Sequence, residues 1–306
     1  MSLRLFHGSA TYPTDARPVL TIGNFDGVHY GHRALLGRVR DEAARLGVPA
    51  CVYTFEPPPR RVLQPEQSPP RILNLEDKVA LLGQAGIDHV VVERFDLELA
   101  AQSPEWFATE ILGKHLHPTA MVVGYDFRFG RRRAGDMALL RQMLPTLPIE
   151  AIERVMYADK VASSSRVREA VASGEVALAA ELLGRPYSFP GLVVRGDGRG
   201  RTIGFPTANL SFEAELLPAP GVYAVRLQVG DERLPGVANL GFRPTFGGHA
   251  LTVEVHLFDF AGDLYGQRVR LEMVRRIRPE QRFSGVAALV AQIGLDVARA
   301  RELLAP

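Results

Sequence analysis

Two histidines stand three residues apart in residues 21–32, TIGNFDGVHYGH, directly after an apolar run and at the start of a helical pattern. His29 and His32 could bind zinc, but a third ligand at a suitable spacing is missing. At a helix start they can instead donate hydrogen bonds to phosphate oxygens, and the helix adds its free amides and the positive end of its dipole. Gly31 lets the backbone approach such a ligand closely. The stretch therefore favours phosphate binding over zinc, and over two surface histidines without a function.

Three further polar clusters follow predicted strands in the same half of the chain: TFEPPP (54–59), GYDFRFG (124–130) and SSSRVR (163–168). In an open parallel sheet, ligands bind outside the carboxyl ends of the strands, so we expect these loops to form one site with the histidine loop. SSSRVR places hydroxyls at a helix start beside Arg166 and Arg168. Taken alone, it favours ordinary serine capping with solvated arginines. Opposite the two histidines, we interpret it as the other side of a triphosphate site.

The glycine-rich stretch 195–210, RGDGRGRTIGFPTANL, lacks the G-K-[ST] of a Walker loop. Its informative residues are Thr207 and Asn209, which point to the same face if the segment is extended. A hydroxyl and an amide oxygen are hard ligands that suit Mg²⁺ when phosphates complete its shell. The alternative is a simple turn, which Pro206 and Asn209 favour.

Residues 251–260, LTVEVHLFDF, alternate in the pattern of a half-buried strand. Glu254 and His256 fall on the face opposite to the valines of this segment. From this pattern alone, Glu254 could be a solvated strand residue.

The elements that position these residues differ between the two halves of the chain. Residues 18–155 alternate strand-like segments rich in Val and Ile with amphipathic helical segments. This alternation predicts a doubly wound parallel sheet with helices on both faces. The helix that starts near His32 is expected to end at Gly47, and a later helix is expected to have Ser103 as its N-cap. The apolar face of the first of these helices is predicted to consist of Leu35, Leu36, Val39, Ala43 and Leu46.

After residue 185 the period changes to strands separated by turn signals, which predicts an antiparallel barrel or sandwich. One helix over 165–184 is expected to lead into this domain. A long amphipathic helix over 283–304, capped by Ser284, is expected to close the chain. The predicted class is therefore α/β, with a doubly wound parallel-sheet domain at 1–184 and an antiparallel β-barrel domain with a long C-terminal helix at 185–306.

Composition limits the classes of function. The chain has 306 residues, enough for about two domains, and its net charge of +2 is too small to argue for a nucleic-acid partner. The single cysteine, Cys51, lies in a strand-like segment and provides neither a disulfide nor a thiol metal site. No apolar run approaches the length of a membrane span, so we expect a cytoplasmic protein without a membrane partner.

GNFDGVHYGH resembles the signature of the nucleotidyltransferases related to class I tRNA synthetases. With TFEP, GYDFRFG, ASSSRVR and LLGRPY in that order, the chain resembles the prokaryotic bifunctional FAD synthetases, in which a riboflavin kinase is joined to an FMN adenylyltransferase. The resemblance implies that residues 1–184 transfer an adenylyl group from ATP to FMN. It implies that ATP is bound by Gly23, Asn24, His29, His32, Ser164, Arg166 and Arg168, with the two histidines catalytic. It implies that the flavin is bound by Phe55, Pro57, Asp126 and Phe127.

Two positions depart from the common pattern of that family. Ser165 stands where Thr is usual, which keeps the hydroxyl. Asp126 stands where many relatives have Asn, so a carboxylate replaces a neutral amide.

The second half resembles riboflavin kinase through GFPTAN, GVYAV, VANLGFRPTF, VEVHLFDF, DLYGQ and IRPEQRF. The resemblance implies that Glu254 is the catalytic base and that Thr207 and Asn209 are the ligands of Mg²⁺–ATP. It also implies that Gly196 and Arg201, together with Thr207, bind the nucleotide, and that Arg278 and Phe283 bind the flavin.

The expected substrates are therefore riboflavin, FMN and ATP, with Mg²⁺ as cofactor. The alternatives are an enzyme with one surviving activity and a non-catalytic flavin-binding or nucleic-acid-binding regulator. The first is disfavoured because the motifs of both halves are intact, and the second because both His29 and Glu254 are present. A tRNA synthetase is disfavoured because no basic anticodon-binding domain is visible.

Overall fold

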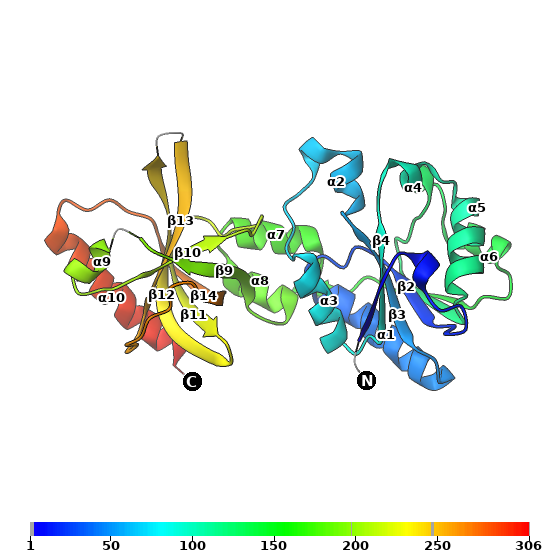
Figure 1. Cartoon of the computed structure of the whole chain (residues 1–306), viewed down its shortest axis with the longest axis horizontal. Coiled ribbons are helices and arrows are strands. Elements are labelled where there is room, and N and C mark those ends of the chain that lie inside the picture. The colour runs from blue at the N-terminus through cyan, green and yellow to red at the C-terminus, as the bar shows by residue number, and fades with distance from the viewer. Residues whose placement is uncertain (1–2, 197, 246–247, 306) are drawn as a thin grey trace. The chain divides into compact units, whose positions relative to one another are not determined.

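The computed structural model describes residues 3–196, 198–245 and 248–305, and its chain divides into two compact units (Figure 1). The first is Met1–Ser163 and the second is Ser164–Pro306. In the described part of the chain, no helix is both long and apolar enough to cross a membrane.

The first unit is built on a six-stranded sheet in the order β1-β4-β3-β2-β5-β6, in which every pair of neighbours is parallel. Its central strands are mostly buried because helices cover both faces. The strands are β1 (Arg4–His7), β2 (Val19–Ile22), β3 (Ala50–Glu56), β4 (His89–Arg94), β5 (Ala120–Gly124) and β6 (Ile149–Ile152). The predicted parallel sheet is confirmed, and β1 is an edge strand that the alternation did not indicate.

Two hydrophobic clusters hold helices to this sheet. On one face, α1 (Tyr30–Leu46) and α3 (Leu75–Gln84) bury Leu36, Val39 and Leu82 against the strands. On the other face, the π-helix η3 (Phe107–Leu116) buries its apolar side with residues of α6 (Met137–Met143). Figure 1 shows α1 and α5 (Pro104–Trp106), which leads into η3, on separate sides of the strands.

The predicted helix ends are confirmed. Gly47 closes α1 in the left-handed conformation at φ 67°. The Ser103 hydroxyl accepts a hydrogen bond from the Trp106 amide at 3.1 Å and caps α5. The remaining short elements of this unit are α2 (Pro59–Leu63), η2 (Pro65–Gln67), α4 (Leu97–Ala101), η1 (Ser9–Thr11), η4 (Arg131–Arg133), β7 (Met156–Tyr157) and β8 (Lys160–Val161).

The second unit is a closed antiparallel barrel in the order β10-β13-β12-β11-β14-β9, so the barrel alternative is confirmed and the sandwich is wrong. Closure leaves the barrel without exposed strand edges. Its strands are β9 (Tyr187–Val194), β10 (Ala208–Phe212), β11 (Gly221–Val229), β12 (Glu232–Thr245), β13 (Gly248–Leu257) and β14 (Arg268–Pro279). The short helix α9 (Arg199–Thr202) lies between β9 and β10.

Helix α10 (Val286–Leu304) packs on the outer face of the barrel through Ala300 and Leu304, which meet Val222 and Val237. The expected cap Ser284 is wrong. The helix begins at Val286 and its N-cap is Gly285, so the serine stands one residue too early for its hydroxyl to reach the first free amides.

The single helix expected over 165–184 is also wrong. It is two helices, α7 (Ser164–Ala172) and α8 (Val176–Leu183). They are separated at Gly174, whose φ of 84° a helix cannot contain. Both helices belong to the second unit, because α8 packs against β9 and β14.

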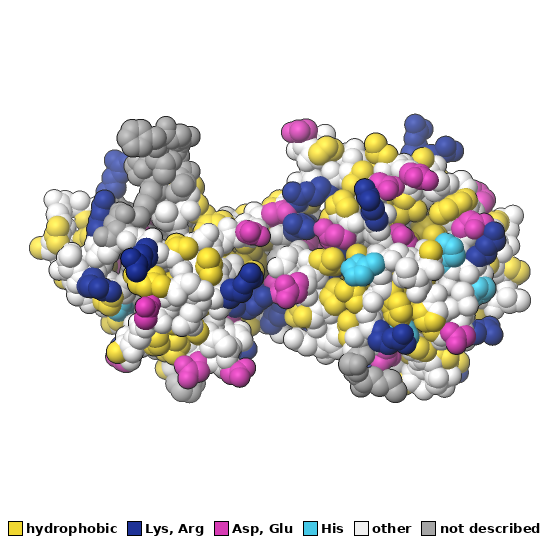
Figure 2. Space-filling view, viewed as in Figure 1, with side chains coloured by type: hydrophobic (Ala, Val, Ile, Leu, Met, Phe, Trp, Pro, Cys, Tyr) yellow, Lys and Arg dark blue, Asp and Glu magenta, His cyan; other side chains and the backbone are white. Residues whose placement is uncertain are grey.

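Charge is spread over the surface of the first unit. On the face that Figure 2 shows, its basic and acidic side chains are interspersed rather than gathered by sign, in keeping with the net charge of +2.

Candidate active sites

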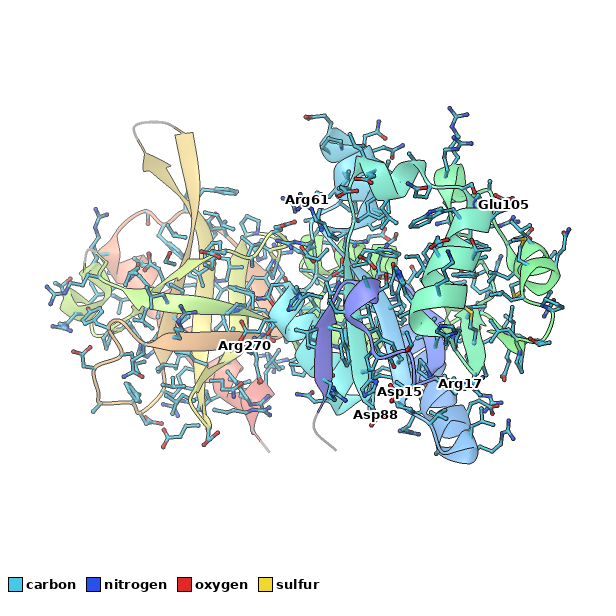
Figure 3. All side chains as sticks on the ribbon, turned by 45° about the vertical axis from the view of Figure 1, so that its right-hand side comes forward. Asp15, Arg17, Arg61, Asp88, Glu105 and Arg270 are labelled. Atoms are coloured by element: carbon cyan, nitrogen blue, oxygen red, sulfur yellow. The ribbon has the colours of Figure 1, made fainter. Side chains whose placement is uncertain are left out.

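The carboxyl edge of the parallel sheet carries the histidine loop. Strand β2 ends at Ile22, and α1 begins at Tyr30 after a loop. Arg61, which follows β3, lies at this end of the sheet, whereas Asp15, Arg17 and Asp88, which precede strands, lie at the opposite end (Figure 3). Because β2 and β5 are neighbours while the chain continues from β2 to β3, this edge is also where the strand order reverses.

His29 is the N-cap of α1. Its Nδ1 accepts a hydrogen bond from the backbone amide of His32 at 3.3 Å, and the side chain is only 5% exposed. Because Nδ1 is the acceptor, the proton of the neutral ring is on Nε2. The ring therefore presents a hydrogen-bond donor at the helix start, which is the arrangement that phosphate binding needs.

His32 stacks on His29, with ring centroids 3.7 Å apart, and its other side meets Phe25 at 5.1 Å. Desolvation, and then the neighbouring His29, lower the pKa of His32 well below its usual value. Its Nδ1 is buried and has no hydrogen-bond partner. The ring is therefore neutral near pH 7, and it would gain a partner from an anionic ligand.

The loop between β2 and α1 is held in an unusual backbone conformation. Phe25, Gly27 and Val28 have φ values of 49°, 90° and 42°. The Asp26 carboxylate anchors the loop by accepting hydrogen bonds from the amides of Ile72 and Leu73 at 3.0 and 3.1 Å. Left-handed backbone at non-glycine residues is costly and persists where the surroundings impose it, which is frequent at ligand sites.

Gly31 permits a close contact at the start of α1. A Cβ atom at this position would stand 3.1 Å from the carbonyl oxygen of Ala162, just before SSSRVR. The segment that enters α7 therefore passes the mouth of α1. Ser164, Arg166 and Arg168 themselves lie on α7 in the second unit, so their contribution to a phosphate site stays a prediction.

The aromatic residues assigned to the flavin pack on one hydrophobic cluster of the sheet. Phe55 contacts Tyr53 and Phe95 edge-on at 5.3 and 5.6 Å. Phe127 stacks on Phe129 at 5.6 Å, and both Phe55 and Phe127 are half-buried against the same core. The peptide bond between Glu56 and Pro57 is cis.

The other residues predicted at this edge are Gly23, Asn24 and Asp126. Gly23 makes a backbone hydrogen bond, and Asn24 and Asp126 are exposed. Gly23 donates its amide to the carbonyl of Tyr53 at 3.1 Å, and the side chain of Asn24 is exposed. Asp126 is exposed, and its carbonyl accepts a hydrogen bond from Arg133 at 3.4 Å.

In the barrel, strand register places polar residues in one row. Asn209 of β10 is directly opposite Glu254 of β13, which is directly opposite Asn239 of β12. Asn239 is opposite Val222 of β11, which is opposite Arg278 of β14. Residues directly opposite in antiparallel strands have Cβ atoms about 5 Å apart. Four strands thus gather a carboxylate, two amides and a guanidinium from distant parts of the chain.

Two cavities adjoin this row. One, of about 320 Å³, is lined by Glu254, Asn239, Arg278 and Phe283. The other, of about 450 Å³, is lined by Arg201 together with residues 260–265. Thr207 lines both of them and therefore lies between the two cavities.

The segment that carries Thr207 is fixed by His256. The ring nitrogen Nδ1 of His256 donates to the carbonyl of Pro206 at 2.9 Å, and its ring meets Phe205 edge-on at 5.4 Å. A Cβ atom on Gly196 would clash with the side chain of Asn209, so the glycine-rich stretch needs its small residue there. Asp197 of that stretch and Phe246 of VANLGFRPTF lie outside the described residues.

Arg278 forms an ion pair that the sequence did not indicate. Its guanidinium binds both carboxylate oxygens of Asp296 on α10, with contacts between 2.7 and 3.0 Å, and lies 5.6 Å from the Phe283 ring. Asp296 is only 3% exposed and also accepts from Gln292. The ion pair fixes the arginine at the cavity wall and ties α10 to β14.

Comparison with known proteins identifies the family. A riboflavin kinase model matches residues 183–304, and an FAD synthetase model matches residues 12–166. The bifunctional riboflavin kinase/FMN adenylyltransferase of Escherichia coli strain K12 is 44% identical over 287 residues, which cover 93% of this chain and 92% of that protein. The chain belongs to the bifunctional riboflavin kinase/FMN adenylyltransferase family.

A second relative supports this assignment, and one solved structure has the same fold. The relative from Pseudomonas fluorescens is 43% identical over 291 residues, covering 94% of this chain and 93% of that protein. A crystal structure from Streptococcus pneumoniae, described as a macrolide-efflux protein, has a TM-score of 0.88 at 29% identity and covers 97% of both chains.

The sequence analysis gave no role to three residues that lie near the candidate sites: Asn239, His256 and Lys78. Asn239 and His256 lie in quoted motifs, and an asparagine within a strand is uncommon enough to have marked the first. Lys78 lies on the apolar face of α3, between Leu75 and Leu82, and is buried at the carboxyl ends of β2 and β3. A lysine at a core position of a helix was the available signal.

Proposed function

We propose that this chain converts riboflavin to FAD in two ATP-dependent steps: phosphorylation of riboflavin to FMN, and adenylylation of FMN with release of pyrophosphate. Both activities are those of the family to which it belongs. The observation that supports the residue assignments best is the cross-strand row of Asn209, Glu254 and Asn239 beside a cavity of about 320 Å³.

In the kinase step, the primary hydroxyl of riboflavin attacks the γ-phosphorus of ATP, and the bond from that phosphorus to ADP breaks. The hydroxyl proton passes to the Glu254 carboxylate. Riboflavin occupies the cavity of Arg278 and Phe283, and ATP occupies the cavity of Arg201, beneath the stretch that contains Gly196. The shared position of Thr207 supports this division, because the transferred phosphoryl group must pass from one cavity to the other.

Mg²⁺ fits the oxygen donors of this site. The Thr207 hydroxyl and the Asn209 amide oxygen are hard ligands two residues apart on an extended segment, and ATP phosphates and water can supply the rest of the shell. The ion, when bound, would neutralise phosphate charge. Thr207 and Asn209 would hold and orient it, while His256 keeps Thr207 in place through the Pro206 carbonyl.

In the adenylyltransferase step, an FMN phosphate oxygen attacks the α-phosphorus of ATP, and the bond to pyrophosphate breaks. The nucleophile is already an anion, so no general base is required. His29 and His32, aided by the start of α1, stabilise charge on the phosphates. Gly23, Asn24, Ser164, Arg166 and Arg168 complete the nucleotide site. The flavin lies against Phe55, Pro57, Asp126 and Phe127.

We assign the adenylyltransferase to residues 1–184 and the kinase to residues 185–306, as the ranges of the two family models support. We also place the enzyme in the cytoplasm, where ATP is abundant and a lone buried cysteine such as Cys51 stays reduced.

One incubation tests the function. The full chain is mixed with riboflavin, ATP and Mg²⁺, and the flavins are separated by chromatography over time. We expect FMN to accumulate first and FAD to follow. If FMN forms from riboflavin but no FAD forms, even when FMN is added, the enzyme has the kinase activity alone.

His29 variants test the adenylyltransferase assignment. His29→Ala removes both the imidazole and the cap of α1, whereas His29→Asn replaces the cap acceptor and removes only the imidazole. We expect both to lose FAD formation from FMN by at least about 10²-fold and to keep riboflavin phosphorylation near wild type. Wild-type FAD formation by a folded His29→Asn protein would exclude His29 from the chemistry.

A further inference from the structure

A buried cation lies beneath the adenylyltransferase loops. The Lys78 side chain is only 5% exposed. Its ammonium nitrogen is 3.3 Å from the Thr54 hydroxyl and 3.5 Å from the carbonyl oxygens of both Asn24 and Phe55. These distances are those of weak, shared hydrogen bonds, so one ammonium serves several acceptors.

No carboxylate pairs with this ammonium among the described residues. The charged groups that face it are Asp26, Glu56 and Arg71. Asp26 is engaged by the amides of Ile72 and Leu73, and Glu56 pairs with Arg71 at 3.0 Å. Desolvation lowers the pKa of Lys78, while the two carboxylates act in the opposite direction. An ammonium without a direct counter-ion is costly to bury, so packing alone does not account for a lysine here.

The two carbonyls belong to the two loops that the reaction must align. Asn24 follows β2 in the loop assigned to ATP, and Phe55 is the penultimate residue of β3 in the segment assigned to the flavin. In a trans peptide the C=O and the following N–H point in opposite directions. With the Asn24 carbonyl directed toward Lys78, the Phe25 amide is directed away from it. Phe25, the residue after this peptide bond, has a left-handed φ of 49°. The contact of Lys78 with the Asn24 carbonyl helps to hold the peptide in the orientation that this backbone requires.

We propose that Lys78 is a positioning residue for adenylyl transfer, which sets the nucleotide loop and the flavin segment in register by binding a carbonyl from each. This inference rests on the proposed function of that sheet edge. Lys78 acts through the backbone of Asn24 and Phe55, not by contact with a substrate. Because in-line attack tolerates little displacement of either reactant, loosening both loops affects binding and turnover together.

Lys78→Met tests the proposal, because it keeps the length of the side chain and removes the charge and the donors. We expect kcat/KM for FAD formation to fall by about 10²-fold, with higher KM for both ATP and FMN and lower kcat. Riboflavin phosphorylation by the same preparation should remain within about two-fold of wild type, which controls for the amount of full-length enzyme. The fluorescence of Trp106, which lies in the first unit, controls for the folding of that unit. Lys78→Gln has a shorter neutral side chain that cannot reach both carbonyls, so it should show the same losses as Lys78→Met. It replaces Lys78→Met in the test if the methionine variant does not fold.

Two further variants separate positioning from stability. Leu82→Ala opens a cavity in the same helix at a residue without exposed surface, and it should lower the melting temperature while leaving both KM values unchanged. Lys114→Met removes an exposed lysine whose partner is Glu110, and it should change neither the melting temperature nor the two KM values. If Lys78→Met changes only the melting temperature, as Leu82→Ala does, the proposal is wrong. If His29→Asn also keeps FAD formation, then it is the assigned site that has failed.

Discussion

At the scale of single residues, the two sites differ because their nucleophiles differ. Riboflavin presents an alcohol, and the barrel places the Glu254 carboxylate between the amides of Asn209 and Asn239. FMN presents a phosphate anion, and the parallel sheet presents histidines at a helix start instead. The proposed assignments supply a proton acceptor in one site and require none in the other, so we expect single substitutions to separate the two activities.

Glu254→Gln keeps the size of the side chain and removes the proton acceptor. We expect riboflavin phosphorylation to fall by about 10²–10⁴-fold, or about 3–5 kcal/mol of barrier, while FAD formation from added FMN stays near wild type. Both rates are measured on one preparation. Glu213→Gln, which alters an exposed carboxylate just after β10, is the matched control and should change neither rate. A kinase rate within a few-fold of wild type in Glu254→Gln would mean that Glu254 is a solvated strand residue.

His32 makes the stability of the first unit depend on pH. Its pKa in the folded chain lies below the unfolded value of about 6.5, so the unfolded state binds more protons below that pH. The free energy of unfolding should therefore decrease as pH falls from 7.5 to 5.5, by about 1 kcal/mol for this group. His89, whose pKa burial also lowers, acts in the same direction.

The contribution of His32 is obtained by difference. Trp106 is the only tryptophan in the chain and lies in the first unit, so its fluorescence during urea unfolding reports on that unit. His32→Gln should show a smaller loss of stability between the two pH values than the wild type. An equal loss in both proteins would mean that His32 titrates normally.

At the scale of elements, helix α1 carries the histidines that we propose to bind phosphate, and we expect two of its glycines to affect the stability of the helix in opposite ways. Gly37 lies inside the helix, and a Cβ there would meet no atom within 4 Å. Gly47 ends the helix at φ 67°, where an L side chain is strained.

Alanine at these two positions should change stability with opposite signs. Gly37→Ala should raise the free energy of unfolding of the first unit by about 0.5–1 kcal/mol, because alanine loses less backbone entropy in a helix. Gly47→Ala should lower it by about 1–2 kcal/mol, because the left-handed conformation disfavours a Cβ. Urea unfolding followed by Trp106 fluorescence measures both. The same sign for both variants would contradict the described end of α1.

At the scale of the whole molecule, the kinase at 185–306 should work as an independent module, and it should be more stable in a fragment that begins at Ser164, where the second unit begins. Helix α8 buries Val176, Ala179, Leu182 and Leu183, and it packs on β9 and β14. Arg276 of β14 also donates to the carbonyl of Ser173 at 3.4 Å, between α7 and α8. A fragment that begins at residue 185 loses these contacts.

We expect fragments 164–306 and 185–306 both to fold and to phosphorylate riboflavin, with the shorter one less stable by several kcal/mol. Burial of each large apolar side chain contributes about 1.5–3 kcal/mol. Thermal unfolding and FMN formation are measured on both fragments. A soluble, folded 164–306 that makes no FMN would refute the independent module, and equal melting temperatures would show that α8 adds nothing to the barrel.

The sequence by itself determined the elements and the chemistry that each half can carry. Alternation of strand and helix patterns predicted the parallel sheet, and the ends of α1 and α5 followed from Gly47 and Ser103, because periodicity and capping are local properties. The same local patterns placed His29 at the start of a helix and Glu254 on the strand face opposite to the valines.

Only the tertiary structure decided which of these residues meet. Asn209 faces Glu254 because the barrel sets the register of β10 against β13, two strands far apart in the chain, and no local pattern encodes that pairing. Lys78 reaches the ends of β2 and β3 because α3 packs across them, and Arg278 is occupied by Asp296 because α10 folds back onto β14. The helix expected over 165–184 divides at Gly174, where a Cβ would stand 2.8 Å from the Tyr223 hydroxyl of the barrel. These contacts join residues far apart in the chain, so they depend on packing and strand register, which emerge only when the whole chain is folded.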